Sequence, residues 1–162
     1  MENEMATEQN PLKVEKLPVE VTFIMLGGEE LTGTIYLDLH SRHHGGPERM
    51  EDIVNSGARF IPILLPDGKV VLLNRQRIIT AHCRQHEADE YELLTQGLLT
   101  DIKATIRLSD GRTIAGALRT DMPREHTRLS DLLNQPEDFT RLVDGELEYF
   151  VNRAYATWFL EG

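Results

Sequence analysis

Two segments joined by a tight turn decide the fold: they read Ile102-Lys-Ala-Thr-Ile-Arg-Leu108, then Asp110-Gly111, then Arg112-Thr-Ile-Ala-Gly-Ala-Leu-Arg-Thr-Asp121. In the first segment apolar side chains alternate with polar ones, which is the period of two expected when a strand buries one face. Asp-Gly between two such segments is a strong signal for a hairpin turn. The stretch therefore predicts two antiparallel strands.

A similar hairpin pattern occurs earlier in the chain. It reads Val19-Glu-Val-Thr-Phe-Ile-Met-Leu26, then Gly27-Gly28, then Glu30-Leu-Thr-Gly-Thr-Ile-Tyr-Leu-Asp38. When the two hairpins are aligned, a glycine and an acidic residue recur in the second segment, Gly33 with Gly116 and Asp38 with Asp121. Self-similarity of this kind indicates an internal repeat.

The features that follow the hairpin also recur, and in the same order. Arg49-Met-Glu-Asp-Ile-Val-Asn55 aligns without a gap with Arg128-Leu-Ser-Asp-Leu-Leu-Asn134, and both segments are expected to form a short helix. Later matches are Phe60 with Phe139, Pro66-Asp67-Gly68 with Asp144-Gly145, and Leu73-Asn74-Arg75 with Val151-Asn152-Arg153. We therefore predict a duplicated unit of strand, turn, strand, short helix, strand, turn, strand and strand, about sixty residues long.

These patterns divide the chain into four parts. Residues 1–17 are polar and aperiodic, so a flexible N-terminal tail is expected. Residues 18–83 and 101–162 are the two predicted β units. Residues 84–100 contain the acidic run His86-Glu-Ala-Asp-Glu-Tyr-Glu92 and are expected to be an acidic linker, either a solvated connector or one that includes a helical turn.

Composition argues against several classes of protein. Seventeen Lys and Arg against 27 Asp and Glu give a formal charge of −10, which repels a phosphate backbone, so we do not expect a nucleic-acid partner. No apolar run approaches the roughly 20 residues of a membrane helix, and no membrane association is expected. The single cysteine, Cys83, cannot form an intrachain disulfide, which favours a reducing, cytoplasmic setting.

The order of five short strands, with a glycine and then an acidic residue in the second, resembles the Sm-like (LSm-type) small β-barrels. Gly33-Thr-Ile35-Tyr-Leu-Asp38 and Gly116-Ala-Leu118-Arg-Thr-Asp121 are similar in outline to that family's first motif. Where its second motif has an apolar pair and Arg-Gly, this chain has Leu-Asn-Arg and Val-Asn-Arg. The resemblance implies a mainly β fold of two tandem small five-stranded Sm-like barrels, each with a short inserted helix. It also implies binding of uridine-rich RNA.

Asn74, Arg75, Asn152 and Arg153 are the most suggestive polar positions, because they recur where two predicted strands meet. Asparagine tolerates left-handed backbone geometry and can bond to its own turn, which would make these residues structural. Arginine supplies a forked donor, which would suit a partner, an RNA or a small anionic ligand. Both interpretations stay open.

Histidines crowd the loop after the second predicted strand, at His40, His43 and His44. Imidazole suits zinc, but no second ligand pair accompanies them, so they are weak metal candidates and we expect no metal and no cofactor. Cys83 follows His82, yet adjacent residues on a strand point to opposite faces and do not form a nucleophile and its base. Without a phosphate loop or a nucleophile elbow, we predict that the protein is not an enzyme.

We therefore predict a non-catalytic, cytoplasmic interaction or assembly module. A unit of about sixty residues is marginally stable alone, so the two units are expected to pack together or to continue edge to edge into a homo-oligomer. The partner is then another protein or a second copy. On the last strand one of Trp158 and Phe159 must point outward, as an interface candidate. The alternatives are RNA or anion binding at the Asn-Arg positions, and a metal-dependent activity at the His-rich loop.

Overall fold

The structure, a computed structural model, describes residues 16–41, 45–86, 99–120 and 128–162. It is mainly β, as predicted from the sequence. The first half of the chain contains β1 (Lys16–Met25), β2 (Glu30–Asp38), α1 (Met50–Val54), β3 (Phe60–Leu64), β4 (Val70–Asn74), the 3₁₀ turn η1 (Arg75–Arg77) and β5 (Ile78–Arg84). The second half contains β6 (Thr100–Leu108), β7 (Thr113–Thr120), α3 (Leu129–Leu133), β8 (Phe139–Asp144), β9 (Leu147–Asn152), η4 (Arg153–Tyr155) and β10 (Ala156–Glu161).

The predicted tail and linker lie mostly outside the described residues. β1 begins at Lys16, within the predicted tail, because Lys16 and Leu17 pair with Asp38 and Leu37 of β2. Residues 87–98 of the predicted linker lie outside the described residues. Neither α1 nor α3, of five residues each, has the length of a membrane span, and no other helix of the described residues has it either.

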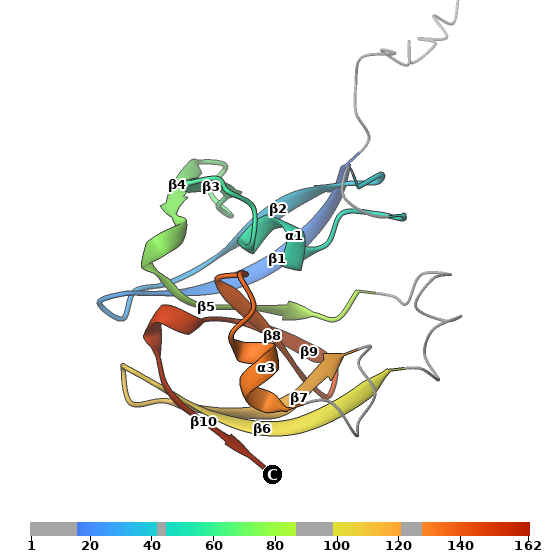
Figure 1. Cartoon of the computed structure of the whole chain (residues 1–162). Helices are drawn as coiled ribbons and strands as arrows, with labels where there is room; N and C mark the ends of the chain where they lie inside the picture. The colour runs from blue at the N-terminus through green and yellow to red at the C-terminus, as the bar shows by residue number, and fades with distance from the viewer. Residues whose placement is uncertain (1–15, 42–44, 87–98, 121–127) are drawn as a thin grey trace, which may run out of the picture.

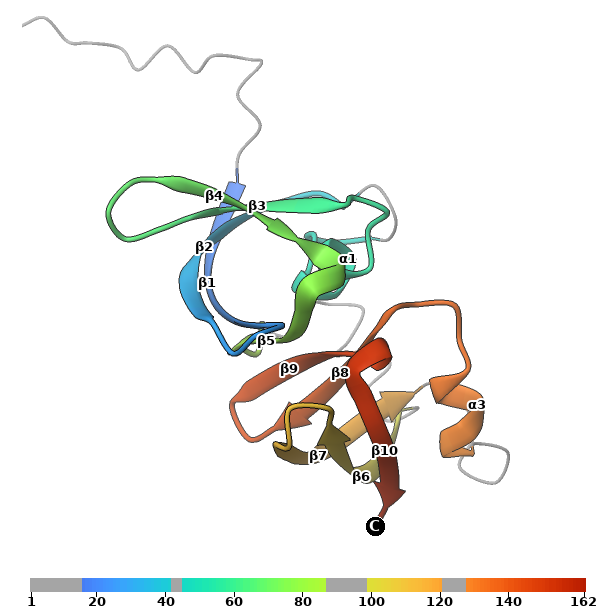
Figure 2. The same ribbon diagram turned by 90° about the vertical axis from the view of Figure 1, so that its left-hand side faces the viewer.

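All ten strands belong to one antiparallel sheet, in the order β10-β6-β7-β8-β9-β5-β1-β2-β3-β4 (Figure 1). Within each half the order is the same: the fifth strand lies beside the first, which is followed by the second, third and fourth. The two halves meet where β5 pairs with β9 (Figure 2). The prediction of two separate barrels is not confirmed, because the ladder runs through both halves and stays open at β4 and β10.

Two glycines let the sheet bend between the second and third strands of each half. A Cβ atom on Gly33 would lie 2.8 Å from the carbonyl oxygen of Leu64, and one on Gly116 would lie 2.5 Å from that of Val143. At each bend only one residue pair joins the strands, Thr34 with Leu64 and Ala117 with Val143. A side chain would prevent this close approach, so the glycines are required by space and not by backbone torsion.

The hydrophobic core has two clusters, and each draws on both halves of the chain. Phe139 and Phe150, from β8 and β9, belong to the cluster that otherwise consists of first-half residues. Ile79, from β5, belongs to the second-half cluster. α1 buries Met50 and Val54 against the first of these. The two halves therefore share their cores across the β5·β9 pairing.

Candidate functional site

The junction between the halves is a five-residue antiparallel ladder. Its Cα partners are Thr80 with Val151, Ala81 with Phe150, His82 with Tyr149, Cys83 with Glu148, and Arg84 with Leu147. Side chains alternate across it, so that Ala81 and Phe150 enter the first cluster while Val151 enters the second. The junction is thus a strand pairing with an apolar core on each face.

A side chain that sequence analysis did not identify as functional fixes this junction. Asn55, the residue that ends α1, accepts a hydrogen bond at Oδ1 from the backbone N–H of Phe139 at 2.9 Å, and its Nδ2 donates to the Phe139 carbonyl at 3.4 Å. It therefore holds β8 against the first half. The sequence signal that could have identified Asn55 was its recurrence as Asn134 in the second half.

The predicted asparagines cap the 3₁₀ turns that follow β4 and β9. Asn74 Oδ1 accepts from the N–H of Gln76, and Asn152 Oδ1 accepts from that of Ala154, both at 3.1 Å. Both asparagines have φ of −69°, so the left-handed geometry considered from the sequence is not used. Asn152 is buried and also donates to the Ile78 carbonyl at 2.9 Å, across the junction.

The predicted arginines are bonded within the protein. Arg75 donates to the carbonyls of Ala58 and Val54 and forms a 2.7 Å ion pair with Asp138, again across the junction. Arg153 donates to Thr140 Oγ1 and to the carbonyls of Leu133 and Gln135. Each arginine therefore holds the loop after a helix against the strands.

The structure describes only some of the metal and nucleophile candidates. His40 is exposed, His43 and His44 lie outside the described residues, and within the described ranges no three His, Cys, Asp or Glu side chains could hold a metal ion. Cys83 is buried, and burial, reinforced by Glu148, raises the pKa of its thiol to about 12. A thiol that stays protonated at neutral pH is a poor nucleophile.

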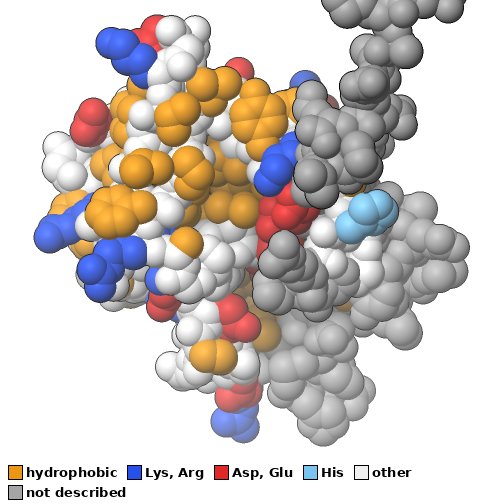
Figure 3. All heavy atoms as spheres, turned by 90° about the horizontal axis from the view of Figure 1, so that it is seen from above, with side chains coloured by type: hydrophobic (Ala, Val, Ile, Leu, Met, Phe, Trp, Pro, Cys, Tyr) orange, Lys and Arg blue, Asp and Glu red, His pale blue; other side chains and the backbone are white. Residues whose placement is uncertain are grey.

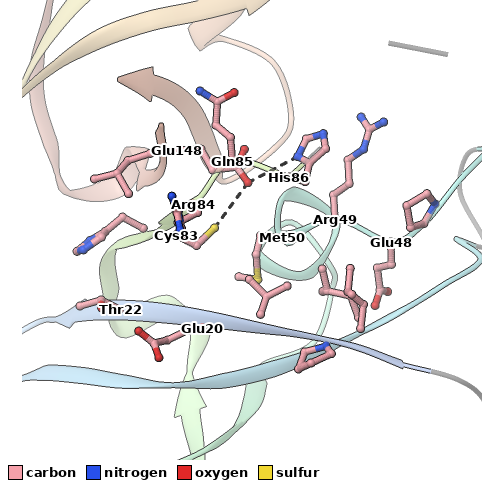
Figure 4. A pocket seen from close by; sticks show the side chains of 17 residues that line it. Glu20, Thr22, Glu48, Arg49, Met50, Cys83, Arg84, Gln85, His86 and Glu148 are labelled. Atoms are coloured by element: carbon pink, nitrogen blue, oxygen red, sulfur yellow. Dashed lines mark hydrogen bonds and ion pairs between the residues drawn. The ribbon is translucent and has the colours of Figure 1, made fainter. Parts of the chain in front are cut away.

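A pocket of about 900 Å³ opens at one end of the junction, lined by residues of β1, β2, the loop before α1, α1, β5 and β9 (Figure 4). In it, Glu148 Oε2 accepts from Arg141 Nε at 2.8 Å, and Oε1 lies 3.7 Å from His86 Nδ1. Burial alone would raise the pKa of Glu148, but hydrogen bonds and charge from His86 and Arg141 hold it below its usual value. The carboxylate is therefore charged and paired, as part of the junction.

The two ends of the sheet expose apolar side chains. At one end these are Phe60 on β3 and Val70 and Leu72 on β4, and Figure 3 shows apolar side chains gathered on this face. At the other end β10 exposes Trp158 and Leu160, while Phe159 packs against the second cluster. Trp158 is thus the outward-facing aromatic residue that the sequence required.

Comparisons with protein-family models, with curated proteins and with solved structures give no significant match. The class of protein is therefore described by its geometry: an open antiparallel sheet with an internal strand junction and two apolar outer strands.

Proposed function

We propose that this protein is a non-catalytic interaction and assembly module whose binding surfaces are the open sheet edges at β4 and β10. The observation that carries the proposal is the exposure of large apolar side chains at both edges, with Val70 at 63%, Leu72 at 62% and Leu160 at 58%. An edge strand presents unpaired backbone N–H and carbonyl groups, which accept a further strand. Apolar side chains beside the edge strand increase the apolar surface area that is buried when another strand is added.

The edges have little of the usual protection against strand addition. Natural proteins commonly place charged residues, proline or a bulge along an open edge strand. The segment Val70-Val-Leu-Leu-Asn74 has no charge and no proline, and β10 has a single charge, at Glu161. The register of β10 shifts between Ala156 and Trp158, but β5 has the equivalent shift against β1 and still pairs with β9. Strands of this kind are suited to be covered by a partner.

The proposal includes the architecture that the sequence suggested: two copies of one Sm-like unit in tandem, in a cytoplasmic protein. Support comes from the equal strand order of the two halves, from the shared close approach at Gly33 and Gly116, and from the matching caps at Asn74 and Asn152. The buried free thiol of Cys83 fits a reducing compartment. RNA or anion binding at Arg75 and Arg153 is less well supported, because both guanidinium groups donate to protein acceptors.

The test is a charge placed on one edge. Leu72→Asp should abolish association of the purified chain and its capture of strand-adding partners, because a carboxylate at that position cannot be buried without a large desolvation cost. Leu26→Asp, at an exposed leucine in the β1–β2 turn, is the matched control and should leave association unchanged. Equal binding by all three proteins, measured by light scattering after gel filtration and by pull-down, would overturn the proposal.

A further inference from the structure

We propose that the pocket at the end of the junction is a further binding site, which takes an extended segment of another protein with the pattern apolar, basic, apolar. The segment pairs through its backbone with part of the β1 edge, and its apolar side chains enter the pocket. Because β1 lies inside the ladder and not at β4 or β10, this site goes beyond the proposed function and is tested separately from it.

The pocket lies where β1 and β5 separate. Their antiparallel ladder ends at the pair of Thr22 with His82. Beyond that pair, β1 continues to Lys16 along β2, whereas Cys83 and Arg84 of β5 pair with β9. Residues from both sides of the separation line the pocket (Figure 4). The pocket is therefore a cleft between two strands that are paired neighbours further along.

The alternation of the ladder decides which backbone groups of β1 face the cleft. The N–H of Met25 donates to the Glu29 carbonyl on the β2 side at 2.8 Å, and the N–H of Leu26 donates to a carbonyl on the β5 side at 2.7 Å. Successive residues of an antiparallel strand direct these groups to opposite edges, so the even-numbered residues of β1 direct theirs toward β5. Glu20 thus presents an N–H and a carbonyl to the cleft, and Pro18 presents a carbonyl alone. A short added segment can exchange both bonds with Glu20.

Apolar side chains form one wall of the cleft. They are Leu17 and Val19 of β1, Leu37 of β2, Met50 of α1 and Leu147 of β9. Leu37 and Met50 are buried in the first core cluster, whereas Leu17 is 43% exposed. The volume of about 900 Å³ lies within the range of roughly 300–1,000 Å³ that is usual for ligand pockets. The cleft can therefore take apolar side chains of a partner.

The other side of the cleft carries carboxylates. Glu20 is exposed and projects from β1 away from Met50 (Figure 4). Glu48, in the loop before α1, also lines the cleft and accepts at Oε1 from the backbone N–H of Asp38 at 3.1 Å. Within the described ranges Glu20 forms no ion pair. Its carboxylate is therefore available to a cation of a partner.

The basic residues that line the cleft already have partners in the chain. Arg84, across the cleft from Glu20, forms a 3.2 Å ion pair with Glu146. Arg49 and His86 also have partners within the protein. The uncompensated charge at the cleft is therefore that of Glu20, and charge complementarity favours a basic side chain over an acidic one.

Strand-pairing geometry turns these features into a sequence pattern. Side chains directly opposite each other in an antiparallel pair lie on the same face and interact. The partner residue opposite Glu20 therefore lies beside its carboxylate, where Lys or Arg is favoured. The two residues that flank it point to the other face, toward the apolar wall. The pattern that fits is apolar, basic, apolar.

The probe is the peptide Gly-Ser-Val-Lys-Val-Ser-Gly, acetylated and amidated, titrated into the isotopically labelled full chain. Amide NMR shifts should change at Glu20 and Leu147, which lie on opposite sides of the cleft. Replacing the peptide's Lys with Glu should weaken binding by about fivefold, since an opposite-charge pair becomes a like-charge pair. The isomer Gly-Val-Ser-Lys-Ser-Val-Gly should also bind more weakly, because its inward residues are serines.

Two variants of the chain locate the site. Leu17→Asn places an uncharged polar group on the apolar wall and should weaken binding of the Lys peptide by about fivefold. Leu26→Asn is its matched control, because the two leucines are 43% and 44% exposed and only Leu17 lines the cleft. Glu20→Lys, at an exposed position, should reverse the preference so that the Glu peptide binds more tightly. The amide spectrum of each variant shows that it is folded.

Binding that needs Leu17, with a charge preference that reverses in Glu20→Lys, supports the inference. It is overturned if the Lys peptide does not bind at millimolar concentration, if Leu17→Asn binds it as the wild type does, or if Glu20→Lys keeps the preference for Lys. Leu72→Asp, which blocks β4, should bind the peptide normally. Loss of binding in that variant would place the peptide at the open edge, so that the inference fails while the proposed function stands.

Discussion

Phe150 and Leu72 occupy equivalent positions in the two halves, yet Phe150 is 1% exposed and Leu72 is 62% exposed. Both side chains are large and apolar, and both lie on the fourth strand of their half. The difference is that β9 has β5 as a second neighbour, whereas β4 has only β3. Burial in this fold therefore depends on the partner strand more than on the local sequence, and β4 is the same kind of strand without its partner.

The largest expected effect is on stability at these two positions. Phe150→Ala removes a buried ring from the shared core and should lower the free energy of unfolding by about 3–5 kcal/mol. Leu72→Ala, at a dilution where the chain is alone, should change it by less than about 0.5 kcal/mol. Urea denaturation measures both. A comparable loss in the two variants would mean that β4 is already covered in the single chain.

The two bending glycines give a second, smaller comparison. Gly116→Ala should destabilise by about 1–3 kcal/mol, because a Cβ there would lie 2.5 Å from one carbonyl oxygen and 2.9 Å from Leu142 Cγ. Gly33→Ala should cost less, since its nearest contact is 2.8 Å. Thermal unfolding distinguishes them. An equal cost, or a larger cost at Gly33, would mean that the closer approach at Gly116 does not determine the loss of stability.

The smallest expected effect concerns the asparagines that end the helices. Asn55→Ala should destabilise the single chain by about 1–2 kcal/mol, because it removes the acceptor of the Phe139 N–H. Asn134→Ala should have a smaller effect, because the Asn134 amide donates to the exposed Ser130 carbonyl, four residues earlier in the same half. Urea denaturation measures both variants. An equal loss in the two would mean that the Asn55 contact with β8 does not stabilise the junction.

Acid should affect the junction through Glu148, for which the open edge has no equivalent carboxylate. The pKa of Glu148 is lowered in the folded protein, so its contribution to stability is present above the ordinary value of 4.5 and is lost as the pH falls through the folded value. The stability difference between wild type and Glu148→Gln should therefore shrink on acidification below that value. A difference that is constant with pH would mean that the Arg141 pairing does not stabilise the fold.

Much of the local structure could be predicted from the sequence, since it depends on near neighbours. Alternation and the Asp-Gly turn predicted the strands and their order along the chain, whereas a turn-bonding role for Asn74 and Asn152 was one of two interpretations that the sequence left open. The pairing of β5 with β9 was not predicted, because it joins residues more than sixty positions apart. Its one signal was the run Ile78-Ile-Thr-Ala81, apolar enough to be buried on both faces. Asn55 was missed because its partner, Phe139, is equally distant.

The measurement that tests the central claim most directly compares two variants with one blocked edge each. Leu72→Asp blocks β4 and Leu160→Asp blocks β10, whereas Leu26→Asp, in the β1–β2 turn, blocks neither edge. Light scattering after gel filtration and pull-down should find binding weakened in both edge variants and unchanged in the control. Unchanged binding in both edge variants would contradict the claim that the open edges are binding surfaces.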